Sequence, residues 1–214
     1  MIFYSVHFNR PDFIGIQKKC IDRIGGILVV INNSDNKSIE DECIRLGVKF
    51  YNYSGGRGMQ PSVSHGMALN YIREIIDYTD DWSIIDHDLF PMKKIDMTNH
   101  DIAGILQSRG SHTYVWPGFM CVRKNINVTN INFLPDNLGD TGSGTSVLLD
   151  GKNRIMEFRE KYIGEATNGF LQNSVVLINI SDLAIHYLNG SAWMGTDRTV
   201  VDEKNKKLLE FLEL

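Results

Sequence analysis

The chain has 214 residues, of which 43% are hydrophobic and 22% are charged, and its formal net charge is -4. This length allows one sizeable hydrophobic core, and the composition is that of a globular protein rather than a disordered or fibrous one. The acidic balance, without a long basic cluster, argues against a broad groove for nucleic-acid backbones.

The three cysteines, Cys20, Cys43 and Cys121, are far apart and odd in number. Such spacing indicates neither a disulfide framework nor a Cys-x-x-Cys metal site, so we expect a cytoplasmic protein. No apolar run approaches the roughly 18 to 20 residues that a membrane span requires, and the first residues lack the pattern of a secretion signal. We therefore expect neither a membrane span nor export.

The first 91 residues alternate between short apolar runs and helical patterns. Strands are expected at about residues 2–8, 27–34, 48–53 and 82–86. Helices are expected between them, at about residues 12–23, 38–46 and 63–78, with Asp12 as the cap of the first. This alternation predicts an α/β fold with a mostly parallel sheet flanked by helices.

The rest of the chain has a more mixed pattern. Strands are expected at residues 101–109, 114–124 and 174–181, and a helix at residues 153–163. The glycine-rich residues 138–146 are expected to form a loop or the entry to a helix. We expect these elements and the first 91 residues to form a single domain.

A mostly polar segment follows each of the first four expected strands. These segments are Phe8–Arg10, Asn32–Ser34, Ser54–Ser64 and Asp86–Asp88. Ligands of parallel sheets bind beyond the carboxyl ends of the strands, so we expect the four segments to face one crevice.

The segment WSIIDHDLFP, Trp82 to Pro91, places two carboxylates directly after the fourth strand. If the strand continues, Asp86 and Asp88 point to one side of it and His87 points to the other. Two converging carboxylates form a site for a hard divalent cation such as Mg²⁺ or Mn²⁺. A turn with two solvated acids is the alternative.

These features resemble the nucleotide-sugar-dependent glycosyltransferases of the GT-A type, in particular the large family 2 group. The order of the elements and the IIDHDLFP stretch carry the resemblance, together with three further segments. Residues 64–72 are similar to the helix before the D-x-D strand, residues 138–144 to the acidic acceptor-side loop, and residues 185–193 to the C-terminal histidine segment. The resemblance implies one GT-A-like domain, with a nucleotide-binding half at residues 1–91 and an acceptor-binding half at residues 92–214.

The resemblance also implies metal-dependent transfer of a sugar from a UDP- or GDP-sugar to a hydroxyl acceptor. Asp88 would bind Mn²⁺ or Mg²⁺ directly, while Asp86 would bind the metal through water or hold the ribose and the donor sugar. His186 would complete the coordination shell, which suits Mn²⁺ better than Mg²⁺, although a core histidine bonded to backbone is the alternative. The metal would neutralise the charge that grows on the β-phosphate.

Further residues at the strand ends are candidates for binding the nucleotide sugar. They are Phe8, Asn9, Arg10, Asn33, Arg57 and His65. His65 lies near an expected helix N-terminus, where backbone N–H groups favour phosphate or ribose oxygens, although Ser62 or Ser64 could simply cap that helix. Arg57 could pair with a phosphate or be solvated.

In the acceptor half, Asp140 is the candidate general base, with Asp136 as a substitute. Family 2 members often have two adjacent acids here, whereas GDTG has one, so both an inverting and a retaining enzyme remain open. Trp116 and Trp193 could stack on sugar rings or pack in the core.

Two other functions remain open. A sugar-phosphate nucleotidyltransferase would normally have a glycine-rich basic loop directly after the first strand, whereas Asn9-Arg10-Pro11 leads straight into a helix. A nucleotide-sugar-binding domain without catalysis would keep the same crevice. Among acceptors we expect a glycan first, and a lipid-linked sugar, a protein or a modified base in DNA are further options.

Overall fold

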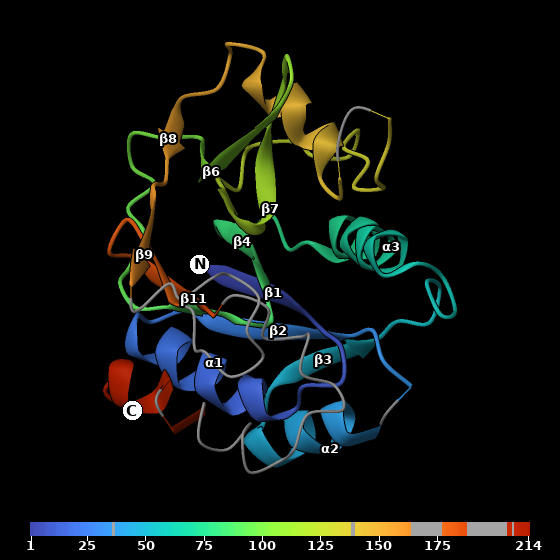
Figure 1. Cartoon of the computed structure of the whole chain (residues 1–214), viewed down its shortest axis with the longest axis vertical. Coiled ribbons are helices and arrows are strands. Elements are labelled where there is room, and N and C mark those ends of the chain that lie inside the picture. Colours follow the sequence, from blue (N-terminus) through green and yellow to red (C-terminus); the bar gives the residue numbers. More distant parts are fainter. Residues whose placement is uncertain (36, 138–139, 164–176, 188–204, 207) are drawn as a thin grey trace.

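The computed structural model describes residues 1–35, 37–137, 140–163, 177–187, 205–206 and 208–214. Within these residues, seven strands form the main sheet and four form a second sheet (Figure 1). The main sheet contains β1 (Ile2–His7), β2 (Ile27–Asn32), β3 (Lys49–Asn52), β4 (Trp82–Asp86), β6 (Ile102–Arg109), β7 (His112–Val122) and β8 (Ile155–Glu157). The second contains β5 (Leu89–Pro91), β9 (Glu160–Ile163), β10 (Leu177–Ile180) and β11 (Ala184–Tyr187). The helices are α1 (Asp12–Arg23), α2 (Lys37–Leu46), α3 (Pro61–Ile75) and the 3-10 helix η1 (Ser143–Leu149).

The main sheet has the order β3-β2-β1-β4-β7-β6-β8 and is mostly parallel, which confirms the α/β prediction. Strands β1 to β4 run parallel to one another, β7 runs antiparallel to β4 and β6, and β8 runs parallel to β6. The register places the carboxyl ends of the four parallel strands level, because His7 lies beside Asn32 and Asn32 beside Asn52. Asp86 lies level with Val6. The polar strand ends therefore meet at one edge of the sheet.

Helices cover both faces of this sheet (Figure 1). On one face α1 and α2 pack through Ile14, Ile21 and Ile39 against side chains such as Phe3. On the other face α3 packs through Leu69 and its neighbours against the alternate side chains of the same strands. Each aliphatic side chain buried in this way contributes roughly 1.5–3 kcal/mol to folding. The two apolar faces explain why the parallel strands are continuous apolar runs.

The first helix begins one residue earlier than an Asp12 cap requires. Pro11 occupies the N-cap position with a helical φ of -65°, and Asp12 is the first helical residue. The Asp12 carboxylate accepts hydrogen bonds from the Arg10 guanidinium, at 2.9 and 2.7 Å. The prediction that Asp12 caps α1 is therefore wrong, because its carboxylate is engaged by arginine.

Residues 153–163 are not the expected helix but two strands. β8 extends the main sheet beside β6, and β9 extends the second sheet beside β10. The backbone of both segments completes a sheet edge, and this tertiary pairing overrides a short apolar spacing that fits either structure. The strands expected at residues 101–109 and 114–124 are confirmed as β6 and β7. Of the strand expected at residues 174–181, residues 174–176 lie outside the described residues.

The second sheet is antiparallel, in the order β5-β11-β10-β9, and it joins distant parts of the sequence. β5 begins directly after Asp88, and its Leu89 pairs with His186 of β11. The amide of Tyr187 donates to the carbonyl of Asp88 at 2.8 Å. This pairing brings β11 next to the D-x-D segment. Over the residues that the structure describes, no helix has the length and apolar character needed to cross a bilayer.

Candidate functional site

The two aspartates of the D-x-D segment do not lie on one extended strand. β4 ends at Asp86, and His87 and Asp88 form a turn that leads into β5. The expectation of a continuing strand is wrong here, because the chain leaves the main sheet to pair with β11 in the second. His87 is turned toward the protein: its Nδ1 lies 3.3 Å from the carbonyl of Val6, and its ring stacks on Phe13. Asp86 and Asp88 consequently have different partners.

Asp88 is buried beside His186, the residue predicted to share a metal with it. The Oδ1 atom of Asp88 lies 3.6 Å from Nε2 of His186, and the two side chains are 9% and 10% exposed. Burial opposes ionisation of Asp88, but the neighbouring His186 outweighs it and lowers the pKa of Asp88 to about 2. Burial also opposes protonation of His186, yet Asp88 and then Asp86 raise its pKa above the ordinary value. The two side chains form an ion pair at pH values where His186 is protonated.

The donor atoms of this pair fit a divalent cation. A separation of 3.6 Å is longer than a hydrogen bond. It is near the roughly 3–3.5 Å that separates two ligands of one tetrahedral or octahedral cation. The Nδ1 atom of His186 is buried and has no hydrogen-bond partner among the described residues. Nor do those residues contain three clustered His, Cys, Asp or Glu side chains that could hold a metal. The pair therefore offers two protein ligands, the number with which Mg²⁺ is usually completed by water and substrate phosphates.

Asp86 faces His65 of α3 rather than the Asp88–His186 pair. Its Oδ1 lies 3.4 Å from Nε2 of His65, and both side chains are partly exposed. Gln60 is the N-cap of α3, so Ser62 and Ser64 lie within its first turn and do not cap it. The start of the helix therefore lies beside Asp86 at the polar edge of the sheet.

Asn33, directly after β2, has a side-chain amide of which only the nitrogen is hydrogen-bonded within the described residues. The Nδ2 atom of Asn33 donates to Oγ of Ser64 at 3.1 Å. Its Oδ1 is buried and, within the described part of the chain, lacks a hydrogen-bond donor. Arg57 is exposed and its Nε lies 2.7 Å from Oδ1 of Asp35. Asn33 thus offers an acceptor to a ligand, whereas Arg57 is engaged with a neighbouring carboxylate.

The three residues after β1 have different environments. Phe8 is 42% exposed at the sheet edge, and Asn9 has a left-handed backbone with a φ of 53°. Arg10 is buried: it pairs with Asp12, and its guanidinium lies 3.6 Å from the centre of the Phe13 ring. Arg10 is therefore held against α1 by its own neighbours.

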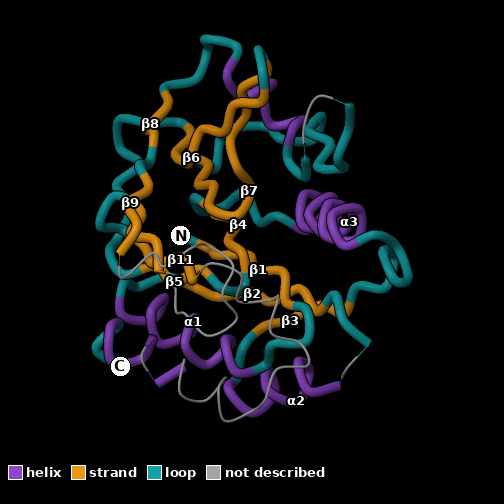
Figure 2. Tube along the Cα trace, viewed as in Figure 1, coloured by secondary structure: helices purple, strands orange, loops and turns teal. Residues whose placement is uncertain are grey.

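The loop that carries the candidate general bases runs beside α3 (Figure 2). A Cβ added to Gly66 of α3 would lie 2.6 Å from the carbonyl oxygen of Phe133, so only glycine permits this approach. Thr141 donates to the carbonyl of Ser62 at 3.0 Å. Asp140 is exposed and lies 3.5 Å from Arg109, and Asp136 is also exposed. The loop therefore borders the same helix start that holds His65 beside Asp86.

Two further residues lie beside the D-x-D turn or its partner His186, and of these only Gln17 was not among the candidates. Trp116 of β7 packs against His186 with ring centres 5.2 Å apart, in a place that Gly118 leaves open. Gln17 of α1 contacts the D-x-D turn itself. A polar residue on the apolar face of an amphipathic helix was the available signal for Gln17. Trp193 lies outside the described residues.

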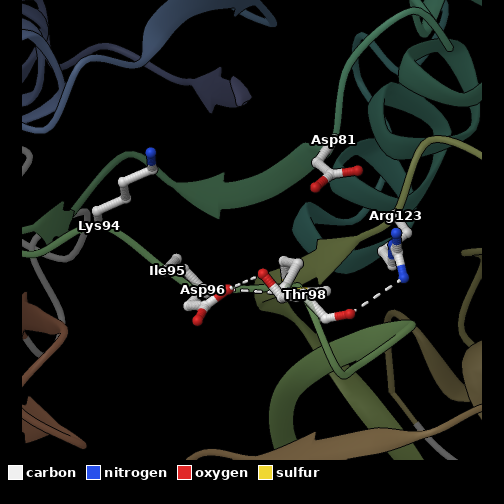
Figure 3. Close-up of a pocket in the computed structure, with 7 residues that line it drawn as sticks. Asp81, Lys94, Ile95, Asp96, Thr98 and Arg123 are labelled. Carbon is white, nitrogen blue, oxygen red and sulfur yellow. Dashed lines mark hydrogen bonds between the residues drawn. The ribbon is translucent and has the colours of Figure 1, made fainter.

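A cavity of about 550 Å³ lies elsewhere, lined by Asp81, which precedes β4, and by Lys94, Thr98 and Arg123 (Figure 3). The amino end of β4 borders it, and Asp86 is at the other end of that strand. Its polar groups bond to one another: Asp96 accepts from Thr98 at 2.6 Å, and Arg123 donates to the Thr98 carbonyl at 3.4 Å. This cavity is therefore separate from the D-x-D turn.

No protein-family model and no curated protein matches the chain significantly. Glycosyltransferases are among the solved structures to which the chain is similar. Glycosyltransferase GlyE of Streptococcus pneumoniae TIGR4, in its apo form, is 12% identical over 73% of this chain and 44% of its own, with a TM-score of 0.46. An active-site mutant of LgtC is 10% identical over 58% and 57%, with a TM-score of 0.44. A glycosyltransferase involved in glycosylation of the PBCV-1 major capsid is 15% identical over 58% and 60%, with a TM-score of 0.32. The chain spans less than two thirds of each of these structures.

Proposed function

We propose that the protein is a metal-dependent glycosyltransferase that moves a sugar from a UDP- or GDP-sugar to a hydroxyl acceptor. The observation that carries the proposal is the buried Asp88–His186 pair next to Asp86, at the edge where four parallel strands end. Ligands of such sheets bind at this edge. Charged groups are costly to bury, and groups with perturbed pKa values cluster at functional sites.

Asp88 and His186 would hold Mn²⁺ or Mg²⁺, which would neutralise the charge that develops on the departing nucleoside diphosphate. The carboxylate and the imidazole are kept in place by the β5–β11 pairing. Asp86 and His65 would hold hydroxyls of the ribose or the donor sugar. His65 can donate from one ring nitrogen while Asp86 accepts from a hydroxyl.

The nucleoside would lie over the ends of β1 and β2. The unpartnered Oδ1 of Asn33 would accept a hydrogen bond from a ring N–H or a hydroxyl, which relieves the cost of a buried acceptor without a donor. Phe8, exposed at the same edge, would offer a flat apolar surface to the base, and Asn9 would contact the donor nearby. Arg57 would reach a phosphate only by leaving Asp35, and Arg10 would act through α1 rather than by direct contact.

The acceptor would approach along the loop beside α3. Asp140 would serve as the general base for the acceptor hydroxyl in an inverting reaction, with Asp136 as the substitute. Arg109, 3.5 Å from Asp140, would then have to share that carboxylate with the acceptor. A glycan is the acceptor that we propose first, and a modified DNA base is the alternative. The location that we propose is the cytoplasm.

The short connection after β1 argues against a sugar-phosphate nucleotidyltransferase. β1 ends at His7 and α1 begins at Asp12, so four residues join them. A glycine-rich phosphate loop after the first strand would need a longer connection with glycines that these residues lack.

The proposal is tested with Asp88→Ala and, as a matched control, Asp96→Ala. Asp96 is an exposed acid between β5 and β6 that lines the separate cavity near the amino end of β4. Calorimetry with Mn²⁺ and nucleotide sugars would give the affinity, and release of the nucleoside diphosphate would give turnover. Asp88→Ala should lower turnover about 100-fold or more, since metal stabilisation of the leaving group amounts to several kcal/mol. Asp96→Ala should behave as the parent.

Unchanged turnover in Asp88→Ala would remove the metal-dependent mechanism. Binding of a nucleotide sugar without cleavage, whichever acceptor is supplied, would instead identify a non-catalytic binding domain.

A further inference from the structure

Gln17 connects helix α1 to the turn that carries Asp88. Its side chain is fully buried, with 0% exposure. Its Nε2 donates to the carbonyl oxygen of Asp86 at 2.8 Å and to that of Leu89 at 2.9 Å. These two carbonyls belong to the last residue of β4 and the first residue of β5. One amide group therefore holds both ends of the four-residue turn.

The orientation of this amide is fixed by its partners. Both hydrogens of Nε2 are used by carbonyl oxygens, so Oε1 must point away from the turn, where His7 Nε2 lies 2.9 Å from it. A flipped amide would set its oxygen against two carbonyl oxygens. His7 must therefore carry its proton on Nε2 and donate it to Gln17.

The opposite side of the turn is held by β11. The Tyr187 amide donates to the Asp88 carbonyl at 2.8 Å, and His186 of the same strand faces the Asp88 carboxylate. The position of Asp88 relative to His186 is consequently set from two sides, by the backbone of β11 and by the side chain of Gln17. Gln17 is the part of this arrangement that can be changed without altering the backbone pairing.

We propose that Gln17 is a positioning residue that sets the spacing between the Asp88 carboxylate and the His186 imidazole, and thereby the affinity of this pair for a divalent cation. The inference rests on the metal site of the proposed function. A bystander glutamine would affect only the stability of the fold. A positioning glutamine changes cation affinity as well, because partners that orient metal ligands typically alter affinity 10- to 100-fold.

Two substitutions remove the contacts in different ways. Gln17→Met keeps the length and approximate volume of the side chain and removes all three hydrogen bonds. Gln17→Glu keeps the shape but replaces the donor with an oxygen that faces two carbonyl oxygens. Ile21→Val is the matched control, because Ile21 is fully buried in the same helix and the change lowers stability without touching the turn.

The experiment measures the Kd for Mn²⁺ by electron paramagnetic resonance titration of the full chain, without nucleotide, together with the Tm of each variant. We expect Gln17→Met and Gln17→Glu to raise the Kd about 10- to 100-fold. Ile21→Val should keep the parental Kd even where its Tm falls as far as that of a Gln17 variant.

The variant Asp88→Ala separates a failure of the Gln17 proposal from a failure of the proposed metal site. Loss of Mn²⁺ binding in Asp88→Ala together with a parental Kd in a folded Gln17 variant would overturn the positioning role and leave the proposed function intact. A parental Kd in Asp88→Ala would overturn the metal site itself, and the role of Gln17 with it.

Discussion

Two histidine–aspartate pairs flank the turn after β4, and they differ in burial far more than in distance. His186 and Asp88, from the second sheet and the turn, are 3.6 Å apart and 10% and 9% exposed. His65 and Asp86, from α3 and the edge of the main sheet, are 3.4 Å apart and 29% and 23% exposed. Charges interact more strongly where water is excluded. The buried pair is therefore a strongly coupled unit, whereas the open pair can exchange its partner for a ligand.

We expect different roles for these two acids, which are one residue apart. Asp88 is held in an environment that favours its charged form and suits a cation. Asp86 lies at the open edge, where a sugar hydroxyl can replace or join His65. Neighbours from separate elements, not the D-x-D spacing, create the distinction.

The largest expected effect comes from breaking the buried pair. Replacing His186 by Ala should lower the free energy of unfolding by about 3–5 kcal/mol, because it removes the imidazole that faces the buried Asp88 carboxylate. Asp88 has a lowered pKa in the folded protein. Its contribution to the free energy of unfolding is therefore present above its unfolded pKa of about 3.9 and is lost as the pH falls toward 2. His186 has a raised pKa, so its contribution is full below about 6.5 and is lost as the pH rises beyond. Urea unfolding at pH 5.5 with a chelator present measures the effect inside this window.

The double variant Asp88→Asn, His186→Ala provides the control. It should recover part of the lost stability, because no buried charge remains without a partner. A loss below about 1 kcal/mol in His186→Ala alone would mean that the pair is not coupled as its burial indicates.

The two regions also differ in how far they could be predicted. The parallel strands and their polar ends follow from local patterns, in which an apolar run, a turn and an amphipathic helix repeat along the chain. The second sheet joins β5 to β11 across a large part of the sequence, and such pairing leaves no periodic signal. His186 could be suggested from the resemblance, but its burial beside Asp88 could not.

The environments of the side chains at the turn could not be predicted from the sequence either. Spacing alone predicted that Asp86 and Asp88 point the same way, and the β4–β5 turn separates them. Arg10 illustrates the same limit, since its position at a strand end indicated a ligand contact while its neighbour Asp12 holds it against α1. In both cases the contact has its partner on another element, or its geometry depends on the turn.

A second, smaller effect is expected from His7, which lies behind the turn and behaves opposite to His186. Burial, together with the charge of His87, lowers the pKa of His7 to about 4. Between pH 6.5 and 4 the unfolded chain binds a proton that the folded chain does not, so stability falls as the pH falls. We expect this group to cost roughly 2 kcal/mol between pH 7 and pH 4.5. Urea unfolding at the two pH values measures the change.

His7→Gln separates this effect from the other titrating groups. Glutamine offers an amide N–H toward Gln17 but does not titrate. The variant should lose less stability on acidification than the parent by about the amount assigned to His7. An equal loss in both proteins would show that His7 does not contribute to the acid sensitivity.

The smallest effect on stability is expected from the open pair. Replacing His65 by Ala should change the free energy of unfolding by less than about 1 kcal/mol, because partly exposed ion pairs contribute little. Asp86 remains solvated in this variant and needs no buried partner.

If His65 holds a hydroxyl of the ribose or the donor sugar, replacing it by Ala should also weaken binding of the nucleotide sugar several-fold, because one hydrogen bond contributes about 1 kcal/mol. Calorimetry with the nucleotide sugar and urea unfolding, performed on one preparation, measure both quantities. A stability loss as large as that of His186→Ala would contradict the distinction between the pairs, since it would mean that the open pair is as strongly coupled as the buried one.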